Sequence, residues 1–281
     1  DAGRCSFSEP FAALFTQGMI CKKSDKDGQL HKMSKSKGNV VSPDELVAKY
    51  GADTLRLYTL FIGPPEKDAE WSDKGIEGAS RFLRKLWRRV SENMDALKSA
   101  EGLQCELSKM EPTEKNLYRK SNETIQMITR DIEGSFHFNS AIARLMELGN
   151  EIDSFAIKAD AGDQRKAVYR NAVETMIILL FPFSPHVSEE LWTELGHEPG
   201  ILKTSWPQIN EQALKKEEVN IVIQINGKVR DKITAPAGMT EKDLEPLIME
   251  RDQVKKYIEG KTVKKFVVVP DKLVNLAVAP S

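Results

Sequence analysis

The spacing of apolar residues changes once along this chain, and the change limits the folds that the chain can adopt. Between residues 73 and 197, apolar residues recur every three or four positions, as they do on the buried face of a helix. After residue 219 they alternate with polar residues, which is the period of a strand with one buried face. The sequence therefore predicts an all-helical bundle followed by a small α+β domain.

Stop signals divide the helical region into separate helices. Two prolines, Pro182 and Pro185, force a break, and Pro185 suits the first position of the helix that follows it. The predicted helices are Lys74–Ala100, Glu114–Ile132, Ser140–Phe155, Asp163–Leu180 and His186–Leu195. We expect a bundle over residues 73–200 and a linker over residues 201–218, which becomes charged at Lys215-Lys216-Glu217-Glu218.

The region from 219 to 281 contains a strong hairpin signal. Asn226-Gly227 joins two alternating runs, Val219–Ile225 and Lys228–Ile233, and Asn-Gly favours a type I′ turn. Two further helices and two further strands are predicted at Thr240–Met249, Arg251–Glu259, Val263–Val269 and Leu273–Val278. A two-residue period places Lys228, Arg230 and Lys232 on one face of the second strand, and we expect that face to bind RNA.

A polar stretch rich in lysine, Lys32-Met33-Ser34-Lys35-Ser36-Lys37-Gly38-Asn39, lies before the bundle. Lysine ammonium groups and serine hydroxyls donate to phosphate oxygens, and glycine permits backbone geometries closed to other residues. Ser42, Pro43 and Glu45 predict a capping box and a helix that begins directly after the stretch and ends near Gly51. We interpret the stretch as a mobile phosphate-binding loop, although a lysine-rich loop that only faces water has the same composition.

Composition narrows the remaining classes of protein. At 281 residues, 40% apolar and 30% charged, the chain is typical of a soluble globular protein of about two domains. It has no apolar run long enough to span a membrane, and we expect no signal peptide because Asp1-Ala2-Gly3-Arg4 lacks an apolar stretch. Cys5, Cys21 and Cys105 are scattered, as are the four histidines, so we expect no metal site and a reducing cytoplasm. The net charge of −1 restricts nucleic-acid binding to local patches.

One such patch is predicted on the helix Lys74–Ala100. Its cations fall at i, i+3, i+4, i+7 and i+8 and so share one face: Arg81, Arg84, Lys85, Arg88 and Arg89. This basic stripe either contacts a phosphate backbone or is a solvated face paired with Glu77 and Glu92, and the sequence leaves both interpretations open.

Two segments resemble class I aminoacyl-tRNA synthetases. Lys32 to Asn39 resembles the KMSKS signature loop of that class, and Tyr50-Gly51-Ala52-Asp53-Thr54-Leu55-Arg56 is similar to the segment that follows the loop there. Within the class, Gln224-Ile225-Asn226-Gly227-Lys228-Val229-Arg230 resembles the bacterial-type leucyl-tRNA synthetases, supported by Glu70-Trp71-Ser72 and Gly78-Ala79-Ser80-Arg81-Phe82-Leu83. The resemblance covers essentially the whole chain.

The resemblance implies that the chain is the C-terminal part of a larger enzyme. Residues 1–72 would be the end of a Rossmann catalytic domain with the KMSKS loop and its stem helices. Residues 73–200 would be an anticodon-binding-type bundle, and residues 219–281 a tRNA-binding domain. The fold class is then multidomain and mainly α, with the small α+β domain last.

The same resemblance implies ATP-dependent activation of leucine, with Mg²⁺, and its transfer to tRNA(Leu) by a monomeric enzyme. ATP contacts are implied for Lys32, Met33, Ser34, Lys35 and Ser36, with Lys32 and Lys35 as the catalytic pair, and tRNA contacts for the two basic faces. No His-x-Gly-His motif occurs in this sequence, so we expect the fragment to be inactive alone. A standalone RNA-binding module, or a fragment of an isoleucyl-, valyl- or methionyl-type synthetase, remains as the alternative.

Overall fold

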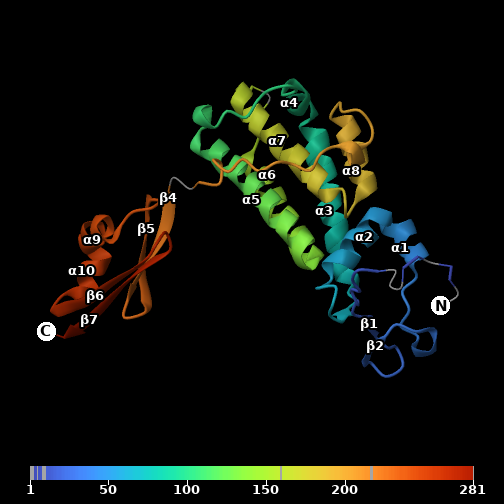
Figure 1. The fold of residues 1–281 in the computed structure, drawn as a ribbon, viewed down its shortest axis with the longest axis horizontal. Helices are drawn as coiled ribbons and strands as arrows, with labels where there is room; N and C mark the ends of the chain where they lie inside the picture. The colour runs from blue at the N-terminus through green and yellow to red at the C-terminus, as the bar shows by residue number, and fades with distance from the viewer. Residues whose placement is uncertain (1–2, 5, 8–10, 159, 216–217, 281) are drawn as a thin grey trace. The chain divides into compact units, whose positions relative to one another are not determined.

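The computed structural model describes residues 3–4, 6–7, 11–158, 160–215 and 218–280 (Figure 1). The chain separates into two compact units, Asp1–Ala213 and Leu214–Ser281, and each unit has its own buried apolar cluster. The predicted order, a mainly helical region followed by a small α+β domain, is confirmed.

The first unit begins with a small three-stranded sheet. β1 (Ile20–Lys23) is the middle strand, antiparallel to β2 (Leu30–Lys32) and parallel to β3 (Ala69–Glu70). Between β2 and β3 the chain forms α1 (Pro43–Tyr50) and α2 (Ala52–Phe61). The lysine-rich stretch therefore connects the edge strand of this sheet to a pair of helices.

The helix α1 begins where the sequence predicts, but the predicted capping box is absent. Ser42 is the N-cap residue and Pro43 lies in the first turn, yet the Ser42 side chain makes no capping hydrogen bond. Gly51 ends the helix with a φ of 87°, a value that favours glycine, and its N–H donates to the Val47 carbonyl oxygen at 2.9 Å. Proline pre-organisation and glycine termination, rather than the side-chain cap, set the bounds of this helix.

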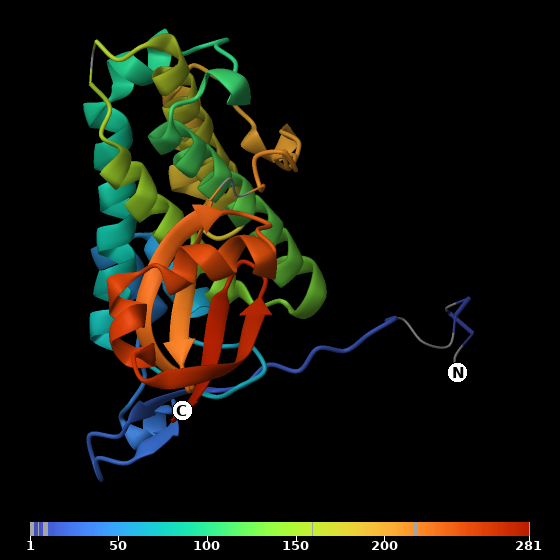
Figure 2. The same ribbon diagram turned by 90° about the vertical axis from the view of Figure 1, so that its left-hand side faces the viewer.

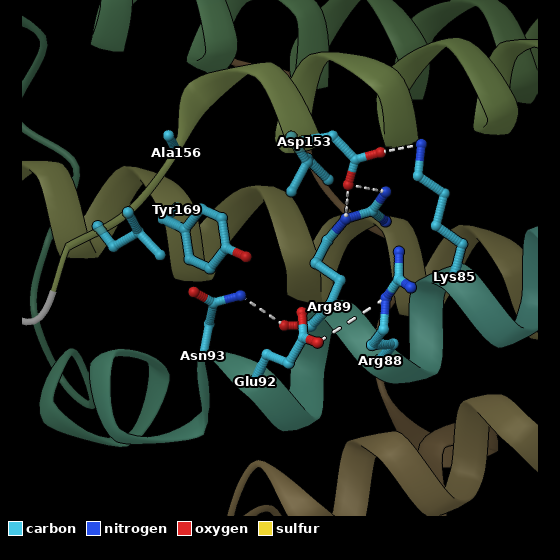
Figure 3. Close-up of a pocket in the computed structure, with 10 residues that line it drawn as sticks. Lys85, Arg88, Arg89, Glu92, Asn93, Asp153, Ala156 and Tyr169 are labelled. Carbon is cyan, nitrogen blue, oxygen red and sulfur yellow. Dashed lines mark hydrogen bonds and ion pairs between the residues drawn. The ribbon is translucent and has the colours of Figure 1, made fainter.

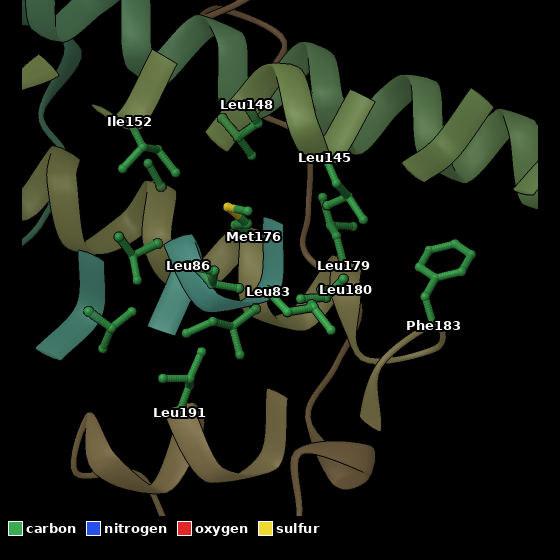
Figure 4. Close-up of a cluster of buried hydrophobic side chains, with 14 of the residues drawn as sticks. Leu83, Leu86, Leu145, Leu148, Ile152, Met176, Leu179, Leu180, Phe183 and Leu191 are labelled. Atoms are coloured by element: carbon green, nitrogen blue, oxygen red, sulfur yellow. The ribbon is translucent and has the colours of Figure 1, made fainter. Parts of the chain in front are cut away.

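Helices packed around one apolar centre form the rest of the first unit. They are α3 (Asp73–Glu92), α4 (Met94–Ser99), α5 (Pro112–Ser135), α6 (Phe138–Phe155), α7 (Asp163–Leu180) and α8 (Pro185–Glu194). Met176 and Leu180 of α7 are fully buried among Leu86, Leu145 and Leu148 from α3 and α6 (Figure 4). No helix in the described ranges is both long and apolar enough to cross a membrane.

The predicted helix Lys74–Ala100 is in fact two helices, because the chain breaks at Asn93. Asn93 has a φ of −115° and a ψ of 17°, and its side-chain amide donates to the Arg89 carbonyl oxygen at 2.8 Å. Asparagine competes in this way with the backbone donors of a helix, which favours a helix end. The apolar period continues across the break, so periodicity alone does not reveal it.

Much of the expected linker is packed against the bundle. The indole N–H of Trp206 donates to the Thr129 hydroxyl at 2.8 Å, and the Asn210 N–H donates to the Asn122 side-chain oxygen at 2.7 Å. Ala213 is buried, and the first compact unit ends there. Residues 201–213 therefore belong to the bundle, while Lys216 and Glu217 of the charged tether lie outside the described residues.

The second unit is a four-stranded sheet with two helices on one face (Figure 2). Its elements are β4 (Glu218–Ile225), β5 (Lys228–Pro236), α9 (Glu241–Met249), α10 (Asp252–Ile258), β6 (Lys261–Val269) and β7 (Leu273–Pro280), with strand order β5-β4-β7-β6. Asn226 and Gly227 have φ angles of 49° and 75°, which confirms the type I′ turn. Ile221 and Ile223 of β4 are buried together with Leu244 of α9.

A β-bulge interrupts the hairpin of β4 and β5. The register shifts between Ile223 and Gln224, because Gln224 pairs with Val229 whereas Ile223 pairs with Asp231. Arg230 is therefore an extra residue without a direct partner on β4. The expectation that Lys228, Arg230 and Lys232 share one face by a two-residue period fails at this point.

The bulge places the two lysines of β5 on opposite faces. Residues directly opposite each other in an antiparallel pair have their side chains on the same side of the sheet. Lys228 is opposite Ile225, which belongs to the buried, helix-covered side, whereas Lys232 is opposite Val222, on the other side. Any phosphate contacts of Lys228 and Lys232 therefore belong to different surfaces.

An ion pair between the buried Arg89 of α3 and the exposed Asp153 of α6 joins these two helices (Figure 3). The Arg89 guanidinium is only 6% exposed; its Nε donates to Asp153 Oδ1 at 2.6 Å and its Nη2 donates to the Gly149 carbonyl oxygen at 2.8 Å. Lys85 also pairs with Asp153. Burial raises the pKa of Asp153, but the hydrogen bonds from Lys85 and Arg89 outweigh it and hold that pKa below its usual value. Arg89 is thus a structural residue and not part of a solvated basic face.

We expect Asp153→Ala to lower the free energy of unfolding of the first unit by about 1 to 2 kcal/mol, because the buried Arg89 guanidinium keeps the Gly149 carbonyl oxygen but loses its charged, solvent-exposed partner. Urea unfolding followed by circular dichroism measures this loss. Arg88→Gln, on the same helix, is the matched control: it removes an exposed pair with Glu92 and should change stability by less than about 0.5 kcal/mol. Equal effects of the two variants would contradict the assignment.

Candidate functional site

The lysine-rich stretch forms a compact loop directly after β2. Lys35–Lys37 make a single 3₁₀ turn, and the Gly38 N–H closes it by donating to the Lys35 carbonyl oxygen at 3.2 Å. Gly38 has a φ of 67°, in the left-handed region that favours glycine. The turn therefore depends on the glycine at the end of the signature.

The side chain of Asn39 holds both ends of this loop. It is 2% exposed, and its amide nitrogen donates to the carbonyl oxygens of Lys22 at 2.8 Å and His31 at 3.1 Å. Its oxygen accepts the Ser34 N–H at 2.9 Å. One buried side chain thus fixes the loop to both β1 and β2, a role that sequence reasoning missed because only the fold brings these carbonyls together.

The residues predicted to contact ATP lie together on this loop. Lys32 and Lys35 are exposed, and within the described part of the chain neither has an acidic partner at ion-pair distance. The hydroxyls of Ser34 and Ser36 are 3.2 Å apart. Met33 is half-buried against the apolar cluster of the first unit, as expected of an anchor. The arrangement offers two unpaired cations and two hydroxyls to an anion.

A second turn, residues 24–29 between β1 and β2, lies against the loop. The Ser24 hydroxyl donates to the Lys37 carbonyl oxygen at 3.0 Å, and Lys26 Nζ donates to the Ser36 carbonyl oxygen at 2.7 Å. The Gln29 N–H and the His31 ring hold the pKa of Asp27 below its usual value. Turn-forming residues mark this segment in the sequence, but they do not indicate what it packs against.

The described residues contain no group of three His, Cys, Asp or Glu side chains that could hold a metal ion.

The structure divides the predicted basic stripe of α3. Arg81, Arg84 and Arg88 are exposed, and Arg88 approaches Glu92 with an N–O distance of 3.9 Å. Lys85 is also exposed but is shared with Asp153, and Arg89 is buried. Three of the five predicted cations are therefore free to meet a phosphate backbone without breaking a structural ion pair.

Arg84 also lines an open cavity of about 570 Å³ with Lys49, Trp87 and His186. Trp87 is 40% exposed, although tryptophan is usually well buried. Trp87 lies outside the apolar stripe of α3, and this position is the feature of the sequence that could have identified it as exposed. An exposed aromatic ring beside cations can stack on an unpaired base while the cations meet its phosphate.

In the second unit Arg230 and its neighbour Asp231 both contact the helix-covered side. The Arg230 guanidinium carbon lies 4.2 Å from the centre of the Tyr257 ring, and Asp231 accepts a hydrogen bond from Arg251 Nε at 2.5 Å. That bond holds the pKa of Asp231 below its usual value. Lys228 and Arg230 thus remain near one another, while Lys232 is exposed on the opposite face.

Two family models match the chain. Residues 4–72 match "tRNA synthetases class I (I, L, M and V)", and residues 114–245 match "Anticodon-binding domain of tRNA ligase". The first match contains the lysine-rich loop and the helices α1 and α2. The second contains most of the bundle and the hairpin of the second unit.

The family model covers enzymes for four amino acids, and individual relatives of this chain are the enzymes for leucine. The chain is 48% identical over 280 residues to the leucine–tRNA ligase of Thermotoga maritima and 45% identical over 278 residues to that of Petrotoga mobilis. Both alignments cover 99% of this chain and 33% of the relative. A solved ternary complex of Agrobacterium radiobacter LeuRS with tRNA and LeuAMS has a TM-score of 0.82 and 31% identity, covering 97% of this chain and 34% of that one. Over 99% of its length the chain therefore matches leucine–tRNA ligases, as a fragment that spans about a third of the length of the curated relatives it matches.

Proposed function

We propose that this chain is the part of a leucine–tRNA ligase that supplies the ATP-binding KMSKS loop and surfaces for tRNA. The reaction joins the leucine carboxylate to the α-phosphate of ATP and releases pyrophosphate; the leucyl group then passes to the tRNA 3′ end with release of AMP. The observation that carries the proposal is the loop itself, in which Lys32 and Lys35 are exposed beside two hydroxyls and have no acidic partner among the described residues.

The loop lysines would act on the pyrophosphate leaving group. Negative charge develops on that group as the bond to the α-phosphate breaks, so a cation that closes on it stabilises the transition state more than bound ATP. Lys35 would contact the phosphates, and Lys32 would assist it. Ser34 and Ser36 would donate hydrogen bonds, and Met33 would anchor the loop by packing. Mg²⁺ would enter as part of the nucleotide substrate, bound through its phosphates.

The leucine pocket and the histidine motif of the active site would come from the rest of the ligase. This sequence has no His-x-Gly-His. We therefore propose that the chain alone does not attach leucine to tRNA. Robust leucylation by the purified chain would contradict this proposal.

For tRNA, we propose phosphate contacts from the exposed cations of α3 and from β5. Arg81, Arg84 and Arg88 have exposed guanidinium groups on one helix face, with Lys85 as a weaker contact because it is shared with Asp153. On β5 Lys228 and Arg230, which both lie on the helix-covered side of the sheet, would bind one stretch of backbone. Lys232, from the predicted set, would contribute least because the bulge turns it to the other face.

We expect Lys35→Ala in the complete ligase to slow leucyl-adenylate formation by about 2 to 4 kcal/mol of barrier, the cost of losing one preorganised donor. ATP–pyrophosphate exchange dependent on leucine measures this step. Lys109→Ala is the control, because Lys109 is an exposed lysine of the bundle paired with Glu106. An exchange rate equal to that of the control would refute the role of Lys35.

We expect Lys228→Glu to weaken binding of tRNA(Leu) and to lower the slope of log affinity against log salt by about one, as for one lost phosphate contact. Filter binding at several salt concentrations gives both quantities. Lys232→Glu is the matched control on the opposite face and should leave the slope nearly unchanged. An effect of Lys232→Glu as large as that of Lys228→Glu would show that the two faces do not differ.

A further inference from the structure

The turn of residues 24–29 is fixed by its own hydrogen bonds. The Ser24 N–H donates to the Gln29 carbonyl oxygen at 2.8 Å, and the Gly28 N–H donates to the Ser24 carbonyl oxygen at 2.9 Å. Asp27 accepts the Gln29 N–H at 2.9 Å and contacts the His31 ring at 2.9 Å. The turn is therefore an ordered element that can support a neighbour.

Two side chains of this turn reach the KMSKS loop. Ser24 is 3% exposed, and its hydroxyl accepts the Lys26 N–H at 3.1 Å while it donates to the Lys37 carbonyl oxygen at 3.0 Å. Lys26 Nζ donates to the Ser36 carbonyl oxygen at 2.7 Å. These acceptors are the two carbonyl groups that directly follow Lys35.

The contacts complement those of Asn39. Asn39 ties the Ser34 N–H to the carbonyl groups of β1 and β2, so it holds the loop before Lys35. Ser24 and Lys26 hold it after Lys35. The backbone on both sides of the proposed phosphate-binding lysine is thus held by side chains from outside the 3₁₀ turn.

We infer that Ser24 and Lys26 are positioning residues for ATP binding, which brace the KMSKS loop so that Lys35 is presented in one arrangement. The inference rests on the proposed function, since it takes the loop to bind ATP. Without the brace the loop samples more conformations, and ATP must order it on binding. The KM for ATP then rises, while kcat, which starts from the ordered complex, changes little.

The first test uses this chain and needs no catalysis. Limited trypsin digestion, with the products identified by mass spectrometry, gives the rate of cleavage after Lys35 and Lys37. We expect Ser24→Ala and Lys26→Met each to raise that rate about fivefold or more, because local order limits cleavage. Ser121→Ala is the matched control: Ser121 is a buried serine of α5 that donates to the Leu117 carbonyl oxygen at 3.1 Å. An unchanged cleavage rate in both variants would contradict the inference that Ser24 and Lys26 order the loop.

The second test uses the complete ligase and ATP–pyrophosphate exchange. We expect Ser24→Ala and Lys26→Met to raise the KM for ATP about three- to tenfold, with kcat and the KM for leucine within twofold. Lys26→Arg, which keeps the donor, should restore the KM for ATP. An unchanged KM for ATP would overturn the inference even if proteolysis changes. By contrast, unchanged exchange in Lys35→Ala would refute the proposed function and leave the proteolysis result standing.

Discussion

Burial of one continuous apolar cluster holds the loop-bearing segment and the helix bundle in a single unit. Leu57 of α2 is as fully buried as Leu86 of α3 and Leu180 of α7, and all three belong to that cluster. A polar contact adds direction to this packing: the Asp53 carboxylate accepts the Val187 N–H at the start of α8 at 2.6 Å and contacts the His186 ring at 2.8 Å. The segment that bears the loop is consequently packed rigidly against the helix bundle.

The loop itself is held in a different way from its base. Apart from Met33, it contributes little to the apolar cluster, and hydrogen bonds from Asn39, Ser24 and Lys26 keep its shape. The Lys26 bond is exposed and can exchange with water at small net cost, whereas Asn39 and Ser24 are buried and their bonds hold the loop more firmly. A hydrogen-bonded loop on a packed base suits the role proposed for this segment, in which Lys35 is held toward ATP.

Local signals in the sequence predicted the elements well where one residue type decides the geometry. Asn226-Gly227 gave the hairpin turn, and Gly51 and Pro185 marked helix ends that the structure retains. Prediction failed where a contact joins residues that lie far apart in the sequence. The burial of Arg89 against Asp153 and the packing of Trp206 on Thr129 depend on partners that no local pattern names. The helix break at Asn93 has a local cause, the Arg89 carbonyl oxygen four residues back, but the apolar period continues across it and hides it.

The sequence by itself determined the order of the helical and α+β regions and the position of the KMSKS loop, because period and motif are local properties of the chain. Only the tertiary structure decided which cations face solvent. A single extra residue at Arg230 places Lys228 and Lys232 on opposite faces of the sheet, and the ion pair with Asp153 takes Arg89 out of the solvent-exposed basic stripe. The tertiary structure also showed what supports the loop, since Ser24, Lys26 and Asn39 act on carbonyl groups that become neighbours only when β1 and β2 pair.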